Sequence, residues 1–310
     1  MLHVRVASPP HLTSRLADTL AADSGVLNLV VLTGAARGPA ADTIQFDLRT
    51  GSANVVFRQL RELQLDGPGA VMVEVVDAPI GAPESPPGRR GLFHTEIAPV
   101  WEMVEADIRA GALYPPSFFV LLVIAGLIAC VGILTNSQIL VVAAMVVGPE
   151  YQAIIAIALG IERRRPGPVR RGALALLGGF GVAIVVAVAF GVAIRLSGHT
   201  PAAYLQGVRP VASLIDQPNL FSVIVAVLAA IVGVVSLTES RANALIGVFI
   251  SVTTIPAAAA LGLSLAYQDW GPAGGSAVQL LLNAGLLIVV GAATLRAQRL
   301  IWRRAGSGPP

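Results

Sequence analysis

The sequence predicts a membrane protein built of helices, preceded by a small α+β domain. Residues are 55% hydrophobic and 13% charged, and the mean hydropathy is +0.75, whereas soluble domains carry about a quarter charged residues. Of the 18 acidic residues, 13 lie before residue 110. Residues 110–149 contain no charged side chain at all. The chain therefore divides into an ordinarily charged N-terminal third and a nearly uncharged remainder.

Residues 1–77 are predicted to form a ferredoxin-like domain with the element order βαββαβ. Alternating apolar residues or runs of Val and Leu predict the strands, and apolar stripes at helical spacing predict the helices. The strands are expected at 2–7, 26–33, 42–49 and 70–76, and the helices at 11–22 and 52–67. Because this fold serves many functions, two interpretations stay open for the domain: assembly or docking, and sensing of a metabolite.

The segment between the two domains contains two parts. Residues 78–92 hold four Pro and three Gly and are expected to be a linker. Residues 93–113 are expected to form an amphipathic juxtamembrane helix that starts near Glu96, with Trp101 and Tyr114 suited to the headgroup region. The membrane domain is then expected at 114–298 and a cytoplasmic tail at 299–310.

The membrane domain is predicted to contain six spans. The uncharged run from 110 to 149 is about twice the length that one span needs, so it must fold into a hairpin around residues 134–137. Four more uncharged runs follow. The expected spans are 117–134, 138–161, 172–194, 217–238, 242–268 and 270–295.

The arginines predict the orientation of these spans. All 21 basic residues are Arg, and ten of the twelve in the membrane domain and tail fall on one side of the predicted spans. The positive-inside rule places that side in the cytoplasm. We therefore expect a multi-pass protein of the inner (cytoplasmic) membrane with both termini in the cytoplasm. The side with ten comprises Arg163, Arg164, Arg165, Arg170, Arg171, Arg241, Arg296, Arg299, Arg303 and Arg304; Arg195 and Arg209 lie opposite.

Two of the predicted spans are interrupted in the same way. The second contains Gly148-Pro149-Glu150 near its middle and the fifth contains Pro256; proline kinks or breaks a helix. Each follows a short polar turn, with Asn136 and Ser137 in one case and Glu239 and Ser240 in the other. Since three spans is an odd number, a second copy must run in the opposite direction, which predicts a 3+3 inverted repeat, typical of many secondary transporters.

Glu150 is the most informative single residue because it is ionisable and lies deep within a predicted span. A charge at that depth is costly and is often functional. The alternative is a neutral carboxyl hydrogen-bonded to Tyr151, Gln152 or a carbonyl freed by Pro149, and the Pro and Gly residues may equally shape packing alone. The candidate residues for binding a substrate or ion are Gly148, Pro149, Glu150, Tyr151, Gln152, Ser251, Thr253, Thr254 and Pro256.

The motifs at the two breaks resemble those of the DUF389 family of bacterial and archaeal membrane proteins. The first is Thr135-Asn136-Ser137-Gln138, then Ala144-Met145 and Gly148-Pro149; the second runs from Ala244 to Ile255-Pro256. The resemblance covers about residues 95–265. Many members carry apolar residues and a second Gly-Pro where this chain has residues 150–153, so Glu150 belongs to a subset at most. The resemblance implies a membrane protein and supplies no activity.

Two function classes remain. The first is a transporter or channel-like permease with a cytoplasmic regulatory domain, and the second is a membrane-anchored regulatory or scaffold protein that acts through its soluble domain. An enzyme is not expected, because HExxH and GxSxG are absent and the four His residues are scattered. No cofactor or metal is expected. The expected partners are the lipid bilayer, an unknown small solute or ion and, as an open option, a second copy in a homo-oligomer; nucleic acid is not expected.

Overall fold

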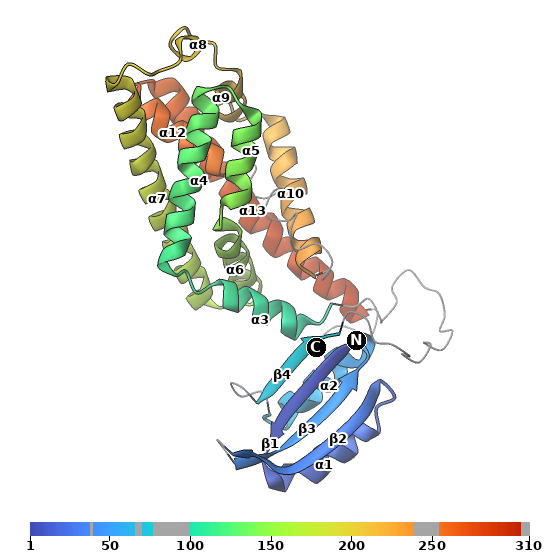
Figure 1. Cartoon of the computed structure of the whole chain (residues 1–310). Coiled ribbons are helices and arrows are strands. Elements are labelled where there is room, and N and C mark those ends of the chain that lie inside the picture. Colours follow the sequence, from blue (N-terminus) through green and yellow to red (C-terminus); the bar gives the residue numbers. More distant parts are fainter. Residues whose placement is uncertain (38–39, 66–69, 77–98, 239–253, 305–310) are drawn as a thin grey trace. The chain divides into compact units, whose positions relative to one another are not determined.

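The computed structural model describes residues 1–37, 40–65, 70–76, 99–238 and 254–304 (Figure 1). The expected linker at 78–92, residues 93–98 of the expected juxtamembrane segment, Arg241 and the end of the tail lie outside the described residues. The chain forms two compact units: residues 1–104 with 298–310, and residues 105–297. Each unit is described by itself.

The first unit contains a four-stranded antiparallel sheet with the strand order β2-β3-β1-β4. Along the chain, strands and helices follow the order β-α-β-β-α-β, apart from one short 3-10 turn. In β1, Leu2, Val4 and Val6 are buried and the residues between them face outward. The elements are β1 (Leu2–Ser8), α1 (Pro10–Ala21), β2 (Val26–Arg37), β3 (Ala40–Leu48), α2 (Ala53–Glu62) and β4 (Val71–Val75).

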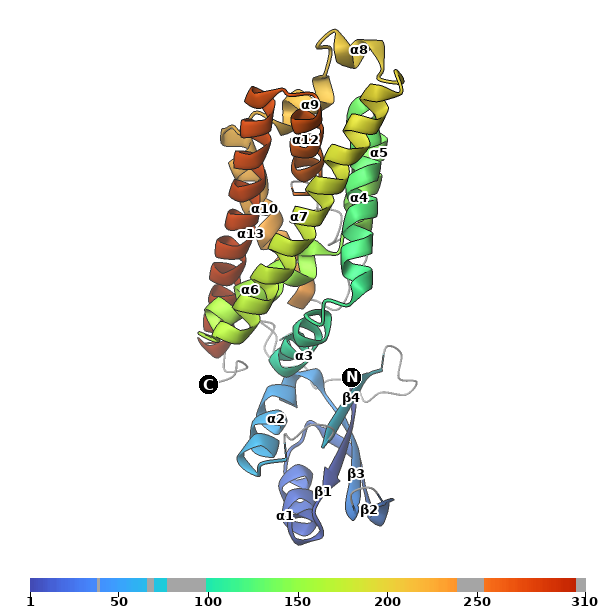
Figure 2. The ribbon, with the colours of Figure 1, turned by 90° about the vertical axis from the view of Figure 1, so that its left-hand side faces the viewer.

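Helices α1 and α2 cover one face of this sheet (Figure 2). Leu16 and Leu20 of α1 and Val56 and Leu60 of α2 are buried against the inward residues of the strands. Burial of a Leu or Val side chain contributes about 1.5–3 kcal/mol, so this apolar layer holds the unit together. The opposite face of the sheet carries the polar residues of β1 and its neighbours.

Helix α3 (Trp101–Gly111) starts later than the sequence analysis expected. Pro99 and Val100 precede the helix, and Asn54 of α2 occupies the space beside them. The Asn54 side chain donates to the carbonyl oxygen of Pro99 (3.2 Å) and accepts from the backbone N–H of Trp101 (3.4 Å). These bonds satisfy the peptide groups at the helix start, which would otherwise be buried without a partner.

The expected role of Trp101 in the headgroup region requires an exposed side chain, but Trp101 is buried. The side chain is 1% exposed. Its ring lies 4.7 Å from the guanidinium of Arg299, in the cation–π arrangement. The aromatic residue thus contributes to packing within the first unit.

The described part of the second unit consists of helices, four of which are long and apolar enough to cross a membrane. They correspond to the first, third, fourth and sixth expected spans. Their ends lie within about six residues of the expected ones, except that the last helix ends nine residues later than expected. These helices are α4 (Pro116–Leu134), α7 (Pro166–Leu196), α10 (Leu220–Thr238) and α13 (Trp270–Arg304). Two short helices, α8 (Ala202–Leu205) and α9 (Pro210–Ile215), lie between α7 and α10 in the chain.

The expected second span is a bent pair of helices, α5 (Gln138–Val147) and α6 (Glu150–Glu162), whose axes differ by 55°. Of the expected fifth span, the structure describes only its second half, α12 (Ile255–Ala266). Over the residues that it describes, the structure thus has four candidate spans, or five when the bent pair is counted as one. The number six and the inverted repeat stay predictions.

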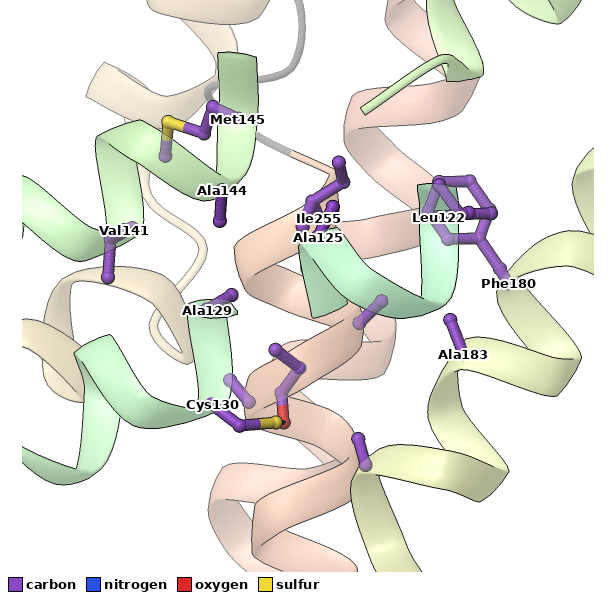
Figure 3. Close-up of a cluster of buried hydrophobic side chains, with 14 of the residues drawn as sticks. Leu122, Ala125, Ala129, Cys130, Val141, Ala144, Met145, Phe180, Ala183 and Ile255 are labelled. Atoms are coloured by element: carbon purple, nitrogen blue, oxygen red, sulfur yellow. Dashed lines mark hydrogen bonds between the residues drawn. The ribbon is translucent and has the colours of Figure 1, made fainter. Parts of the chain in front are cut away.

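Small residues allow the helices of this unit to approach closely. The side chains of Ala125, Ala129 and Cys130 on α4 point toward α5 and α12 (Figure 3). Ile255, the first residue of α12, belongs to the same buried cluster (Figure 3). Small side chains at helix contacts are typical of membrane proteins, because backbones can then pack against each other. The start of α12 is therefore in the interior of the unit.

Candidate functional site

The site is built along α7, and its first component is the half-helix α6. A Cβ added to Gly160 of α6 would come 2.7 Å from the Val169 side chain of α7, and one added to Gly172 of α7 would come 2.7 Å from Ile157. Larger residues at these two positions would clash, so the glycines allow the two helices to touch. The pairing runs antiparallel, so the start of α6 points toward the middle of α7.

The half-helix α12 packs on the other end of α7 by the same means. A Cβ on Gly262 of α12 would come 2.4 Å from Ala187, and one on Gly191 of α7 would come 2.7 Å from Ala266. This pairing runs parallel to α7. Continued at the same register, both half-helices start at about the level of Gly179 along α7. They run from there in opposite directions (Figures 1 and 2).

A hydrogen bond joins the two helix starts. Thr254, the residue before α12, donates its hydroxyl to Oε1 of Glu150, the first residue of α6, over 2.9 Å. Both residues are 0% exposed. The sequence analysis placed these residues in the two halves of one site, and the structure brings them into contact across 104 positions of the chain.

The two helix starts also concentrate backbone donors. The first N–H groups of a helix have no partner within it, and the helix dipole leaves a partial positive charge there. The Thr254 side chain makes no capping bond to its own helix; Pro256 lacks an N–H, and the hydroxyl turns to Glu150 instead. The Glu150 carboxyl lies at the N-terminus of α6, where a negative charge is favoured. The place suits a carboxylate.

The bend before Glu150 follows from its two neighbours. Gly148 ends α5 in an extended conformation (ψ 129°) and Pro149 precedes α6 (φ −92°). A residue before proline is disfavoured in the helical region, so the chain leaves the helix at Gly148. Both residues are half-buried, and Pro256 is buried in the first turn of α12.

Tyr151 and Gln152 do not share the contact of Glu150. The Tyr151 hydroxyl donates to the carbonyl oxygen of Gly233 in α10 over 3.0 Å. Gln152 is exposed and lies next to Gly111 of α3. Tyr151 thus ties α6 to α10. Ser251 and Thr253 lie outside the described residues, so their expected place in the site stays a prediction.

The turn residues Asn136 and Ser137 lie at the far end of α5. Asn136 adopts the left-handed conformation (φ 53°) and donates to the carbonyl oxygen of Val208 over 3.1 Å. Ser137 caps α5 by accepting from the N–H of Leu140. The ten residues of α5 separate them from the bend, about 15 Å along the helix. They shape the hairpin, while the matching turn at Glu239 and Ser240 lies outside the described residues.

Three buried polar residues of α13 were missed in the sequence analysis. Ser276, Gln279 and Asn283 are 0%, 6% and 0% exposed, and Gln279 donates to the Asn283 side chain over 3.2 Å. They recur at positions i, i+3 and i+7 of an apolar span, which is the spacing of one helix face. That periodicity could have identified them.

Asn283 lies at about the depth of Glu150. A Cβ on Gly291 of α13 would contact Ala158 of α6 at 3.5 Å. Asn283 and Glu150 each precede that contact by eight residues, and both helices run toward the same end of the unit (Figure 1). Within the described ranges, no group of three His, Cys, Asp or Glu side chains is arranged for a metal ion.

Comparison with known proteins connects these helices to one family. The model of DUF389, described as a domain of unknown function, matches residues 145–289. The match contains the bend, both helix starts and the polar face of α13, whereas the turn at Asn136 precedes it. No curated protein and no solved structure matches the chain. The chain is thus similar to the DUF389 family over residues 145–289, and its apolar helices indicate a membrane protein.

Proposed function

We propose that this protein is a transporter or channel-like permease for a small solute or ion. The observation that carries the proposal is the Glu150–Thr254 contact between two half-helix starts. Non-helical backbone inside a membrane is tolerated only where it is buried in protein or lines a cavity. In secondary transporters such breaks form the binding site.

The direction of the half-helices supports an inverted repeat. Helix α6 leaves the middle of α7 toward the Arg163 end and α12 leaves it toward the Arg195 end. We infer that α4–α7 forms one repeat and residues 220–304 the other, with six spans in total. Each repeat then contributes one helix start to the site.

Glu150 is the group that we assign to ion binding. Its carboxyl is fully buried, and a charge at such depth costs at least about 2.5 kcal/mol unless it is protonated or paired. A proton or small cation that binds between Glu150 and Thr254 would relieve this cost, which couples binding to the position of α6 relative to α12. An anionic solute would instead meet the N–H groups of the two helix starts.

The distribution of arginines supports the orientation. Arg163, Arg164, Arg165, Arg170 and Arg171 surround the turn between α6 and α7, whereas Arg195 and Arg209 lie toward the other end. By the positive-inside rule, we place the first end in the cytoplasm of a multi-pass inner-membrane protein, together with both termini. The first unit is then a cytoplasmic, ferredoxin-like regulatory domain.

The test is cation and proton flux into liposomes that contain the full chain. We expect proton or monovalent-cation flux above that of empty liposomes, and at least a tenfold loss in Glu150→Gln. Glu162→Gln is the matched control, because Glu162 ends the same helix and pairs with Arg163; it should retain flux. The proposal would be contradicted if Glu150→Gln carried as much flux as the wild type. It would also be contradicted if the wild type carried no flux above that of empty liposomes.

A second candidate is regulation through the soluble unit. A pocket of about 140 Å³ lies on the open face of the sheet, and His3, Arg5 and Glu74 place charged or titratable groups around it. A metabolite that stabilises the full chain and loses its effect in Arg5→Gln, but not in Glu150→Gln, would favour this function. In both cases the proposed activity is binding or transport and not catalysis.

A further inference from the structure

A second polar site lies at the arginine-rich end of the second unit. A pocket of about 160 Å³ opens between α3, α6 and the start of α7. Four arginines and one acid line it: Arg109, Arg163, Arg165, Arg171 and Glu105. The pocket is separate from Glu150, which lies at the other end of α6.

The charges in this pocket do not balance. Both carboxylate oxygens of Glu105 are occupied, one by Arg109 (2.9 Å) and one by Arg163. In the described part of the chain, no acidic side chain forms an ion pair with Arg165 or Arg171. Two of the arginines that line the pocket therefore have no acidic partner among the described residues, and guanidinium is suited to bidentate binding of phosphate.

The other walls of the pocket are apolar. Ile108 of α3 and Ala156 and Leu159 of α6 line it. The surface beside it is apolar as well: Leu113 is 72% exposed and Leu174, one turn after Arg171, is 58% exposed. A charged pocket that continues into exposed apolar surface at a membrane boundary fits a molecule with a phosphate group and acyl chains.

We propose that this pocket binds the phosphate headgroup of an anionic phospholipid. Basic pockets at the ends of membrane helices are suited to such headgroups, and the exposed leucines accommodate the acyl chains. Arg165 and Arg171 hold the phosphate, while the Glu105 pairs keep α3 against α6. A bound lipid thereby links α3 to the broken helix. The inference does not depend on which solute the protein moves.

The test is lipid binding to the full chain in detergent, measured as thermal stabilisation during titration. The probes are phosphatidylglycerol, phosphatidylcholine and inorganic phosphate. We expect stabilisation by phosphatidylglycerol alone, with an apparent affinity roughly 30-fold weaker in the double variant Arg165→Gln, Arg171→Gln, because two basic contacts are lost.

The control is the double variant Arg164→Gln, Arg170→Gln, which removes the same charge from exposed neighbours that do not line the pocket. This control should keep at least a third of the wild-type affinity for phosphatidylglycerol. The double variant Arg165→Lys, Arg171→Lys should recover part of the affinity that the glutamine pair at the same positions loses. An equal loss of affinity in both glutamine double variants would mean that general surface charge binds the lipid, and it would contradict the proposed pocket. Equal stabilisation by inorganic phosphate would overturn the lipid and identify a soluble phosphate compound as the occupant.

Discussion

The two half-helices have the same packing and different chemistry. Both α6 and α12 lean on α7 through a pair of glycines, one from each partner helix. At their starts, however, α6 presents the carboxyl of Glu150 and α12 the hydroxyl of Thr254. The two ends meet in one hydrogen bond.

The shared glycine contacts serve the packing of the fold, whereas the different side chains at the two helix starts concern function. Glycine contacts at equivalent places hold each half-helix in register against α7. A carboxyl requires polar partners when it is buried, and the Thr254 hydroxyl is one of them. We therefore expect the packing to be sensitive in both halves, whereas changes of polarity should act through the shared bond.

The largest effect should come from filling the glycine contacts. Gly262→Leu would drive a Cβ to 2.4 Å from Ala187 and about 3.1 Å from the backbone oxygen of Ile184, which cannot move aside. Overpacking of this kind costs about 3 kcal/mol or more. Gly172→Leu should cost somewhat less, because its nearest contact is longer, 2.7 Å to Cγ1 of Ile157, although the backbone oxygen of Ala153 lies 3.0 Å away. Thermal unfolding of the full chain measures both.

Gly181→Leu is the control for these substitutions. Gly181 lies on α7, where an added Cβ would meet no atom within 4 Å. Its midpoint of unfolding should stay within a few degrees of wild type. A loss as large as that of Gly262→Leu would mean that α7 tolerates no bulk at all, and the glycine pairing would not explain the result.

The next effect tests the shared bond. Thr254→Val keeps the shape of the side chain and removes the hydroxyl that reaches Glu150, so a buried acceptor loses a donor; this should cost about 1–2 kcal/mol. Thr254→Ser should recover most of that loss. In a Glu150→Ala background, Thr254→Val should cost clearly less, since residues in contact are not additive. Additive losses in the double mutant cycle would contradict the coupling.

The sequence predicts the break in the helix and marks Glu150 as a candidate, but it does not predict which residue Glu150 contacts. Gly148 and Pro149 predict the bend from local backbone chemistry alone, and Glu150 is conspicuous because its surroundings in the sequence are apolar. That Thr254 and not Tyr151 bonds to Glu150 depends on the register of two helices against α7. These registers depend on contacts up to about 75 positions apart, such as the one between Ala187 and Gly262, which one sequence does not display.

The arginine pocket and the start of α3 show the same limit. The arginines are visible in the sequence as a cluster that orients the chain, yet the balance of charge around Glu105 depends on which of them reach it. Trp101 has the character of an interfacial residue, but Arg299 from the far end of the chain covers its ring. Local pattern thus predicts elements and their breaks, whereas tertiary contacts decide roles.

A smaller effect distinguishes the two prolines. Pro149→Ala frees Gly148 from the restriction that proline places on the preceding residue, so a straighter path through α5 and α6 becomes accessible; we expect a loss of about 1 kcal/mol. Pro256→Ala should be near neutral, because proline in the first helical turn only replaces an N–H that lacks a helical partner. Unfolding of both variants under one condition gives the comparison, and equal losses would contradict it.

The smallest effect concerns the start of α5, which is capped in the ordinary way. Ser137 accepts from the N–H of Leu140 at 3.4 Å, a long bond, so Ser137→Ala should cost about 0.5 kcal/mol, at the low end for such caps. Thr135→Ala is the control, because the Thr135 hydroxyl is exposed and donates only to the carbonyl of its own helix turn. If Ser137→Ala destabilised the chain as much as Thr254→Val, the hairpin turn would matter to the fold as much as the contact of the two helix starts. The expected order, with Thr254 well above Ser137, follows because a buried carboxyl loses its donor in one case and a helix end near the surface loses a weak bond in the other.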